Sequence, residues 1–314
     1  METVLAIVCP GQGSQTPGLL APWLEDASAR DLLTGFSEAS GTDLLRHGTE
    51  SDEATIRDTA VAQPLIAAAS LLSAHALGLT AQQLASLGDR VLVSGHSVGE
   101  IPAAALAGAL TDEQALELIA VRAQAMAEAA HAAPTGMSAV LGGKADEVIT
   151  AIEAAGLKAA NVNAPGQVVA AGSQQALEQL AENPPARTRV IALKVAGAFH
   201  TDYMAPAAKS LAEAAEAVQP TDPQVTLLSN RDGTAVDAGA EVLRRIIAQV
   251  TSPVRWDQCM ESMSAMGVTG VLELMPGGTL VGLAKRGLKG VASYALTSPE
   301  DLEGAAEFIT EHTS

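Results

Sequence analysis

The sequence has few aromatic residues, only two cysteines and half as many basic as acidic residues. Its 314 residues include two Trp, two Tyr and three Phe, so the core must be built from the aliphatic residues that dominate the 48% hydrophobic fraction. Cys9 and Cys259 are too few and too far apart for a disulfide framework or a structural zinc site. We therefore expect inert core thiols and a reducing, cytoplasmic location.

Basic charge is scarce, and long apolar runs are missing. Lys and Arg total 18 against 36 Asp and Glu, which argues against a nucleic-acid partner because phosphate neutralisation needs a basic surface. The longest apolar run, Ile101–Leu110, is too short for a membrane span, and Met1-Glu2-Thr3 lacks the basic region of a secretory signal. We expect no membrane partner, no metal and no cofactor. No exposed heptad pattern is present, so we expect a monomer.

One stretch of the chain predicts a reactive serine. An apolar run, Val91-Leu92-Val93, leads into Gly95-His96-Ser97-Val98-Gly99, and the helix-favouring segment Ala103–Leu110 follows. This order of strand, tight turn and helix, with Gly-x-Ser-x-Gly at the turn, is typical of a nucleophile elbow. We expect the Ser97 hydroxyl to lie beside the N-terminus of the helix, where a developing anion is stabilised.

The remaining pattern predicts an α/β protein in two parts. Buried strands that alternate with helices, starting at Val4–Cys9, predict an α/β-hydrolase-like parallel-sheet domain at residues 1–126 and 198–314. Residues 127–197 follow the order β-α-β-β-α-β, with a hairpin around Ala164-Pro165-Gly166. This order is ferredoxin-like, so we expect a small domain inserted into the larger one.

A helix is predicted from Asp112 to about Ala130, with Thr111 as its N-cap. Arg122 falls on the apolar stripe of this helix, away from the acidic stripe. A buried guanidinium without a partner is costly. Its partner is therefore either an acid from elsewhere in the chain or a substrate carboxylate held by two hydrogen bonds. Two further helices are predicted over 19–39 and 254–263.

A serine nucleophile needs a base, and histidine titrates in the right range. His96 adjoins Ser97, but we expect its side chain to diverge from the serine. His200 lies at the predicted junction of the two parts, so we predict that it faces Ser97 across a cleft. Asp146 and Asp202 are better explained as helix N-caps than as partners of this histidine. A backbone carbonyl is the alternative orienting group.

Several motifs occur in a fixed order along the chain. They are Pro10-Gly11-Gln12-Gly13-Ser14-Gln15, Thr59-Ala60-Val61-Ala62-Gln63-Pro64, Gly95-His96-Ser97-Val98-Gly99-Glu100, Arg122, Gly197-Ala198-Phe199-His200 and Gln249-Val250-Thr251-Ser252-Pro253-Val254-Arg255-Trp256. This ordered set resembles the malonyl-CoA:acyl carrier protein transacylase family over nearly the whole chain. The family fold, an α/β-hydrolase-like domain with a ferredoxin-like insert, agrees with the two parts predicted above.

The resemblance implies a catalytic role for each matched residue. It makes Ser97 the acyl-accepting nucleophile and His200 its base. A main-chain carbonyl near Gln249 would orient the histidine. The backbone N–H groups of Gln12 and Val98 would form the oxyanion hole.

The resemblance also implies specificity and partners. Arg122 would bind the malonyl carboxylate, Gln63 would contact the substrate, and the Phe199 ring would exclude an α-methyl branch. The implied reaction is ping-pong transfer from malonyl-CoA to the phosphopantetheine thiol of acyl carrier protein, in fatty-acid or polyketide synthesis. Carrier proteins are usually acidic, as this chain is, so attraction must be local. Candidate basic residues are Arg187, Arg189, Lys194, Lys285, Arg286 and Lys289.

Two other functions stay open from the sequence. A cytoplasmic esterase or thioesterase with the same elbow would release malonate and CoA without a carrier protein. The lack of a clear acid between Ser97 and His200, and the inward Arg122, count against it. A scaffold with a decayed site is the second alternative, but every expected catalytic group is present.

Overall fold

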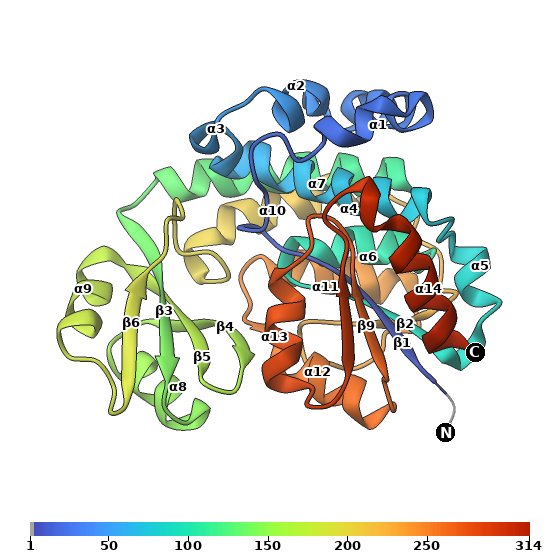
Figure 1. The fold of residues 1–314 in the computed structure, drawn as a ribbon. Helices are drawn as coiled ribbons and strands as arrows, with labels where there is room; N and C mark the ends of the chain where they lie inside the picture. Colours follow the sequence, from blue (N-terminus) through green and yellow to red (C-terminus); the bar gives the residue numbers. More distant parts are fainter. Residues whose placement is uncertain (1–2) are drawn as a thin grey trace.

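The structure, a computed structural model, describes residues 3–314 and contains two five-stranded sheets (Figure 1). Met1 and Glu2 lie outside the described residues. They belong to the segment in which we expect no secretory signal. The small sheet and its helices lie to one side of the parallel sheet (Figure 1). This mixed α/β layout confirms the predicted fold class.

The larger sheet is entirely parallel, with the order β10-β9-β1-β2-β7. Its strands are β1 (Leu5–Cys9), β2 (Val91–Gly95), β7 (Thr226–Leu228), β9 (Gly270–Glu273) and β10 (Ala292–Ala295). Every residue of β1 and β2 is buried, as expected where helices cover both faces of a parallel sheet. Because the strands are parallel, the loops that leave β1, β2 and β7 emerge at the same edge.

Alternate residues of β1 pack against different helices. Leu5 and Ile7 belong to the main core, whereas Ala6 and Val8 belong to a second core on the opposite face. The main core is formed with α1 (Ala27–Ser40), α4 (Thr59–Ala76), α6 (Glu100–Leu106), α7 (Asp112–His131), α10 (Ala205–Ala215), α11 (Gly239–Gln249) and α14 (Leu302–Thr313). The second core is formed with α12 (Trp256–Ala265) and α13 (Thr279–Gly287). The period of two along β1 thus builds the layered fold.

Helix α4 stands out by its apolar composition. Of the described helices, it is the one that is long and apolar enough to cross a membrane, but 78% of it is buried inside the protein. It contacts α1 and α7 and lies within the main core. This packing accounts for its composition.

The predicted helix over 19–39 is divided into two parts. A 3-10 turn occupies Ala21–Glu25, and α1 begins only after Asp26, whose carboxylate accepts a hydrogen bond from the Ser28 N–H at 2.7 Å. This N-cap starts a new helix, which is why the segment is not continuous. Three short helices complete this part of the chain: α2 (Leu44–Thr49), α3 (Glu53–Arg57) and α5 (Ala81–Ala85).

The smaller sheet has the order β6-β3-β5-β4-β8. Its strands are β3 (Thr135–Gly142), β4 (Lys158–Ala164), β5 (Gln167–Ser173), β6 (Thr188–Ala192) and β8 (Val254–Arg255), and its helices are α8 (Ala145–Ala154) and α9 (Gln174–Glu182). The first four strands pair antiparallel in the ferredoxin-like order. The fifth strand, β8, comes from the distant part of the chain and pairs parallel with β4.

Several local expectations differ from the structure. The helix predicted over 254–263 begins at Trp256, because Val254–Arg255 pairs with β4 instead. Asp146 is not an N-cap, since Lys144 precedes α8 in that position. Asp202 follows the cap Thr201 in a 3-10 turn. Helix α7 also continues past the boundary predicted at residue 127, and the domain boundaries stay a prediction.

Candidate active site

Ser97 occupies a strained turn directly after β2. Its φ is 55°, in the left-handed region that residues other than glycine rarely adopt. A Cβ on Gly95 would lie 1.9 Å from the Gly99 carbonyl oxygen, and a Cβ on Gly99 would lie 2.2 Å from the Cys9 carbonyl oxygen. Only glycine fits at these two positions, as the elbow pattern requires. The tight turn presents the Ser97 hydroxyl at the edge of the parallel sheet.

His200 faces Ser97 as the sequence predicts. Its Nε2 lies 2.8 Å from Ser97 Oγ, and its Nδ1 lies 2.8 Å from the main-chain oxygen of Gln249. A carbonyl only accepts, so Nδ1 carries the proton and Nε2 is free to accept from the serine hydroxyl. His200 also has a positive φ, of 60°. The Thr201 hydroxyl donates to the Ala198 carbonyl oxygen at 2.7 Å and helps to hold this loop.

The surroundings of His200 keep it neutral. Burial, followed by the nearby charge of Arg122, lowers the pKa of His200 from 6.5 to about 3. Both effects oppose the imidazolium, because the first removes water and the second places a cation beside it. The ring is therefore in the form that accepts a proton.

Arg122 points inward from α7 and is 1% exposed. Its Nη1 donates to Gln63 Oε1 at 2.6 Å, and its Nη2 donates to Gln249 Oε1 at 2.9 Å. Nη2 also lies 3.5 Å from Ser97 Oγ, whereas Nε is buried without a hydrogen-bond partner. Between residues 3 and 314, no ion pair joins this guanidinium to a carboxylate. Burial lowers the pKa of Arg122 to about 10, so it remains charged at neutral pH.

A cavity of about 280 Å³ opens above these groups. Gln12, Ser97, Val98, Phe199 and His200 line it from loops and turns of the larger part of the chain, and residues of β3, β4 and β5 line the opposite side. The Gln12 side chain is 3.3 Å from the hydroxyl of Thr59, which fastens the loop after β1. Every residue with a predicted site role except Arg122 and Gln249 lines this cavity, and those two contact Ser97 from behind it.

Three polar residues of the site, none of which is a histidine or part of the Gly-x-Ser-x-Gly pattern, have no role predicted above. Asn230 follows β7, and its Oδ1 accepts from the Ser97 N–H at 2.7 Å. Glu100 is buried at the start of α6 and accepts from Asn230 and Gln249. Asn163 on β4 lies 2.9 Å from Nε2 of His96, and both residues line the cavity.

The sequence offers only weak signals for these residues. Asn230 is a polar residue at the carboxyl end of a strand, where ligand-contacting groups of parallel sheets gather. Glu100 is a lone acid at the head of an apolar helix. Neither of these two sequence features predicts which distant segment the Asn230 or Glu100 side chain contacts.

Comparisons with known proteins agree with this geometry. A family model described as the acyl transferase domain matches residues 6–308. The malonyl CoA-acyl carrier protein transacylase of Mycobacterium tuberculosis (strain ATCC 25618 / H37Rv) is 50% identical over 303 residues, which cover 96% of this chain and 99% of the relative. This chain belongs to the acyl transferase family.

Solved structures of acyl transferases superpose on nearly the whole chain. The crystal structure of MCAT from Mycobacterium tuberculosis has a TM-score of 0.91 and 49% identity, covering 96% of this chain and 99% of that one. A malonyl-transacylase in complex with a type II PKS acyl-carrier protein has a TM-score of 0.86 and 28% identity, covering 97% and 99%. In the acyl transferase described here, His200 is oriented by a carbonyl rather than by an acid, which separates it from esterases of the elbow type.

Proposed function

We propose that this acyl transferase moves a malonyl group from malonyl-CoA to the phosphopantetheine thiol of an acyl carrier protein through a malonyl-serine intermediate. One observation carries the proposal: a single hydroxyl lies 2.8 Å from a neutral histidine and 3.5 Å from a buried guanidinium that has no carboxylate partner among the described residues. A substrate that brings its own carboxylate completes this site.

In the first half-reaction, Ser97 attacks the thioester carbon of malonyl-CoA while its proton moves to Nε2 of His200. The backbone N–H groups of Gln12 and Val98, which both line the cavity, stabilise the oxyanion. The C–S bond then breaks, and His200 returns the proton to the departing CoA sulfur. The carbonyl of Gln249 stabilises the imidazolium during this exchange.

In the second half-reaction, the carrier-protein thiol gives its proton to His200 and attacks the malonyl ester. The tetrahedral intermediate collapses, and the serine oxygen leaves with the proton from the imidazolium. Both half-reactions use one site, so the kinetics are ping-pong. Because the ester must survive between them, the cavity between the two sheets has to keep water away from it.

Two residues set the acyl selectivity. The Arg122 charge stays unpaired when an acyl group without a carboxylate binds, which disfavours acetyl groups, and the Phe199 ring narrows the cavity against branched groups. Arg122 also opposes the charged form of His200. A malonyl carboxylate neutralises that effect, so the base becomes stronger when the correct substrate is bound.

Exposed lysines within two positions of cavity-lining residues suit a carrier protein. Lys194 lies between Leu193 and Val195, which both line the cavity, and Lys285 lies on α13, whose residue Leu283 also lines it. All six basic residues proposed from the sequence are exposed. Local basic charge of this kind attracts an acidic partner in spite of the net charge of −18. We place the reaction in the cytoplasm, since Cys9 and Cys259 are free and buried.

Mass measurement of the intact protein tests the proposal. Incubation with malonyl-CoA should add one malonyl group to the wild-type protein and none to Ser97→Ala. Addition of holo acyl carrier protein should remove the adduct and load the carrier. Ser94→Ala is the matched control, because Ser94 is buried in β2 outside the cavity lining. Release of free malonate at the same rate without a carrier would instead identify a thioesterase, and no adduct with no turnover would identify a scaffold.

A further inference from the structure

Glu100 is a buried acid that the proposed mechanism does not use. It is the first residue of α6 and is 6% exposed. It belongs to a small cavity behind the nucleophile and is not among the residues that line the substrate cavity. Burying a carboxylate without a direct ion pair is costly, so the fold must gain something from it.

The Glu100 carboxylate holds two residues that reach the active site. Its Oε1 accepts from the Asn230 N–H, and its Oε2 accepts from Nε2 of Gln249. The Asn230 side chain in turn accepts from the Ser97 N–H and donates to the Gly95 carbonyl oxygen, each at 2.7 Å. Glu100 therefore supports both sides of the strained elbow through one intermediate residue.

Gln249 connects Glu100 to the proposed carboxylate-binding group. The Gln249 amide nitrogen donates to Glu100 and to the Ser97 carbonyl oxygen at 3.0 Å, and its amide oxygen accepts from Arg122 at 2.9 Å. An ionised carboxylate only accepts hydrogen bonds, so it demands the NH₂ end of the amide. The oxygen end must then face the guanidinium, which only donates.

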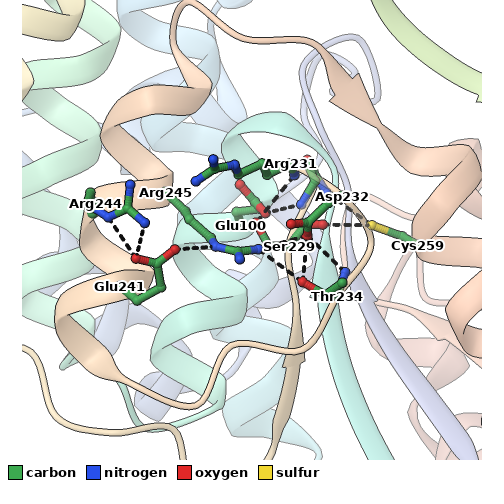
Figure 2. Close-up of polar contacts among 10 residues, drawn as sticks. Glu100, Ser229, Arg231, Asp232, Thr234, Glu241, Arg244, Arg245 and Cys259 are labelled. Carbon is green, nitrogen blue, oxygen red and sulfur yellow. Dashed lines mark hydrogen bonds and ion pairs between the residues drawn. The ribbon is translucent and has the colours of Figure 1, made fainter.

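A second layer of charged groups fixes the loop after β7, which carries Ser229, Asp232 and Thr234 and lies next to Glu100. Figure 2 shows Glu100 beside Ser229, with the Arg245 side chain reaching from α11 toward Asp232 and Thr234. Arg245 binds Asp232 Oδ1 at 2.8 Å and Glu241 Oε1 at 2.7 Å. Helix α11 carries both Arg245 and Gln249, so one helix fixes the loop and the amide together.

We propose that Glu100 is a positioning residue for malonyl selectivity: its carboxylate fixes the orientation of the Gln249 amide and thereby holds Arg122 in place for the substrate carboxylate. This inference rests on the proposed function of Arg122. Glu100 touches neither the substrate cavity nor Arg122 directly. It acts through Gln249.

The titration of Glu100 gives this role a pH dependence. Burial raises the pKa of Glu100 from 4.5 to about 7, against the opposing effects of its hydrogen bonds and of the Arg122 charge. The other ionisable groups around it are Arg245, which lines the same small cavity, and the Cys259 thiol, whose pKa is raised by burial to about 12. Neither changes charge near neutral pH. Below pH 7 Glu100 becomes neutral and gains an O–H donor, so the carboxyl group no longer accepts equally at both oxygens and holds the Gln249 NH₂ group less firmly.

The test is the ratio of kcat/KM for malonyl-CoA to kcat/KM for acetyl-CoA. Glu100→Gln keeps the shape but sets an NH₂ group against the Gln249 amide, so malonyl transfer should fall by roughly 10- to 100-fold. Acetyl transfer should fall less, and the ratio should drop by about tenfold or more. Glu273→Gln is the matched control: Glu273 is a fully buried acid that accepts from backbone N–H groups of α13 instead of from Gln249, so the ratio should not change.

The wild-type ratio supplies a readout that does not depend on the folding of a variant. It should rise as the pH rises through about 7. The parameter kcat/KM reports titrations of the free enzyme and the free substrate, so those of His200 and of the CoA phosphates are common to both substrates and cancel. In Glu100→Gln the ratio should be independent of pH. Equal loss of both activities with an unchanged ratio, or a wild-type ratio that is flat across this range, would overturn the inference. A wild-type protein that forms no malonyl adduct would overturn the proposed function itself.

Discussion

The parallel sheet and the small antiparallel sheet contribute to the same cavity in different ways. The loops leaving β1, β2 and β7 bring Gln12, Ser97 and Asn230 to one edge, and Ser97 and His200 both have positive φ. The small sheet contributes side chains from its strands, such as Val169 in the paired part of β5 and Asn163 at a register shift of β4. One sheet therefore holds reactive groups in strained geometry, and the other shapes the opposite wall.

The two regions also differ in what they bury. The small-sheet core consists of aliphatic residues such as Val140 and Ile152. Behind the elbow, the parallel-sheet part buries Glu100, Arg122 and His200. Buried charges and strained turns reduce stability, and they persist where function needs them. The comparison predicts that substitutions near the elbow affect chemistry and stability strongly, whereas those in the small sheet have moderate effects.

The largest effect is expected from Arg122→Ala. Malonyl transfer should fall by roughly 10⁴-fold, since the substrate carboxylate loses its buried partner, whereas acetyl transfer should hold or increase. Steady-state kinetics with both thioesters measures this selectivity. Arg46→Ala, which removes an exposed arginine from α2, is the control for loss of charge. An equal fall with both substrates would assign Arg122 a structural role.

Glycine substitutions compare the backbones of the two sheets directly. Gly95→Ala should destabilise the protein by about 4 kcal/mol or more, because the new methyl would meet backbone atoms at 1.9 Å. Gly166→Ala, in the β4–β5 hairpin, has a φ of 74° but no atom closer than 3.7 Å to the new Cβ, so about 1 kcal/mol is expected. Denaturant unfolding measures both values. Similar losses of unfolding free energy at Gly95 and Gly166 would contradict the predicted difference between the two sheets.

The pH dependence of stability should reveal the buried Glu100. Its pKa is higher in the folded protein, so between pH 4.5 and about 7 the folded state keeps a proton that the unfolded state has lost, and stability falls as the pH rises. The cost approaches about 3 kcal/mol above pH 7. Glu100→Gln should remove this component, which appears as the difference between the two unfolding curves over pH. A constant difference would show that Glu100 is ionised with an ordinary pKa.

The smallest effect on activity is expected from a substitution in the small sheet, which lines the opposite side of the cavity. Asn163→Ala removes the hydrogen bond to His96 and should lower kcat/KM by about fivefold for malonyl-CoA and acetyl-CoA alike. Kinetics with the two substrates checks the equality. A selective loss of malonyl transfer would mean that the small sheet also participates in recognition of the carboxylate.

Features with a local cause could be predicted from the sequence. The glycine spacing around Ser97 predicts the elbow because a Cβ at either glycine cannot fit. The helical period places Arg122 inward, and the order of strands predicts the ferredoxin-like pairing. His200 could be selected because few histidines lie near a junction of the two parts.

Features that depend on contacts between distant segments could not be predicted. Strand β8 has two residues, and only the free edge of β4 makes it a strand. The amide network joins Glu100 to Asn230 and to Gln249. Each of these two residues lies more than a hundred positions after Glu100 in the sequence. The direction of each hydrogen bond in this network depends on which donor and acceptor groups the fold brings together. A local sequence pattern does not contain that information.

The β4–β8 pairing has a consequence for chimeric enzymes. A graft that replaces the ferredoxin-like segment alone would carry its own edge strand but not the two-residue strand that covers it, because Val254 and Arg255 come from the host. The exposed edge of the grafted β4 would then have to pair with a β8 segment whose sequence comes from a different protein. Exchange of this module between relatives should therefore succeed more often when the short segment before α12 is transferred with it.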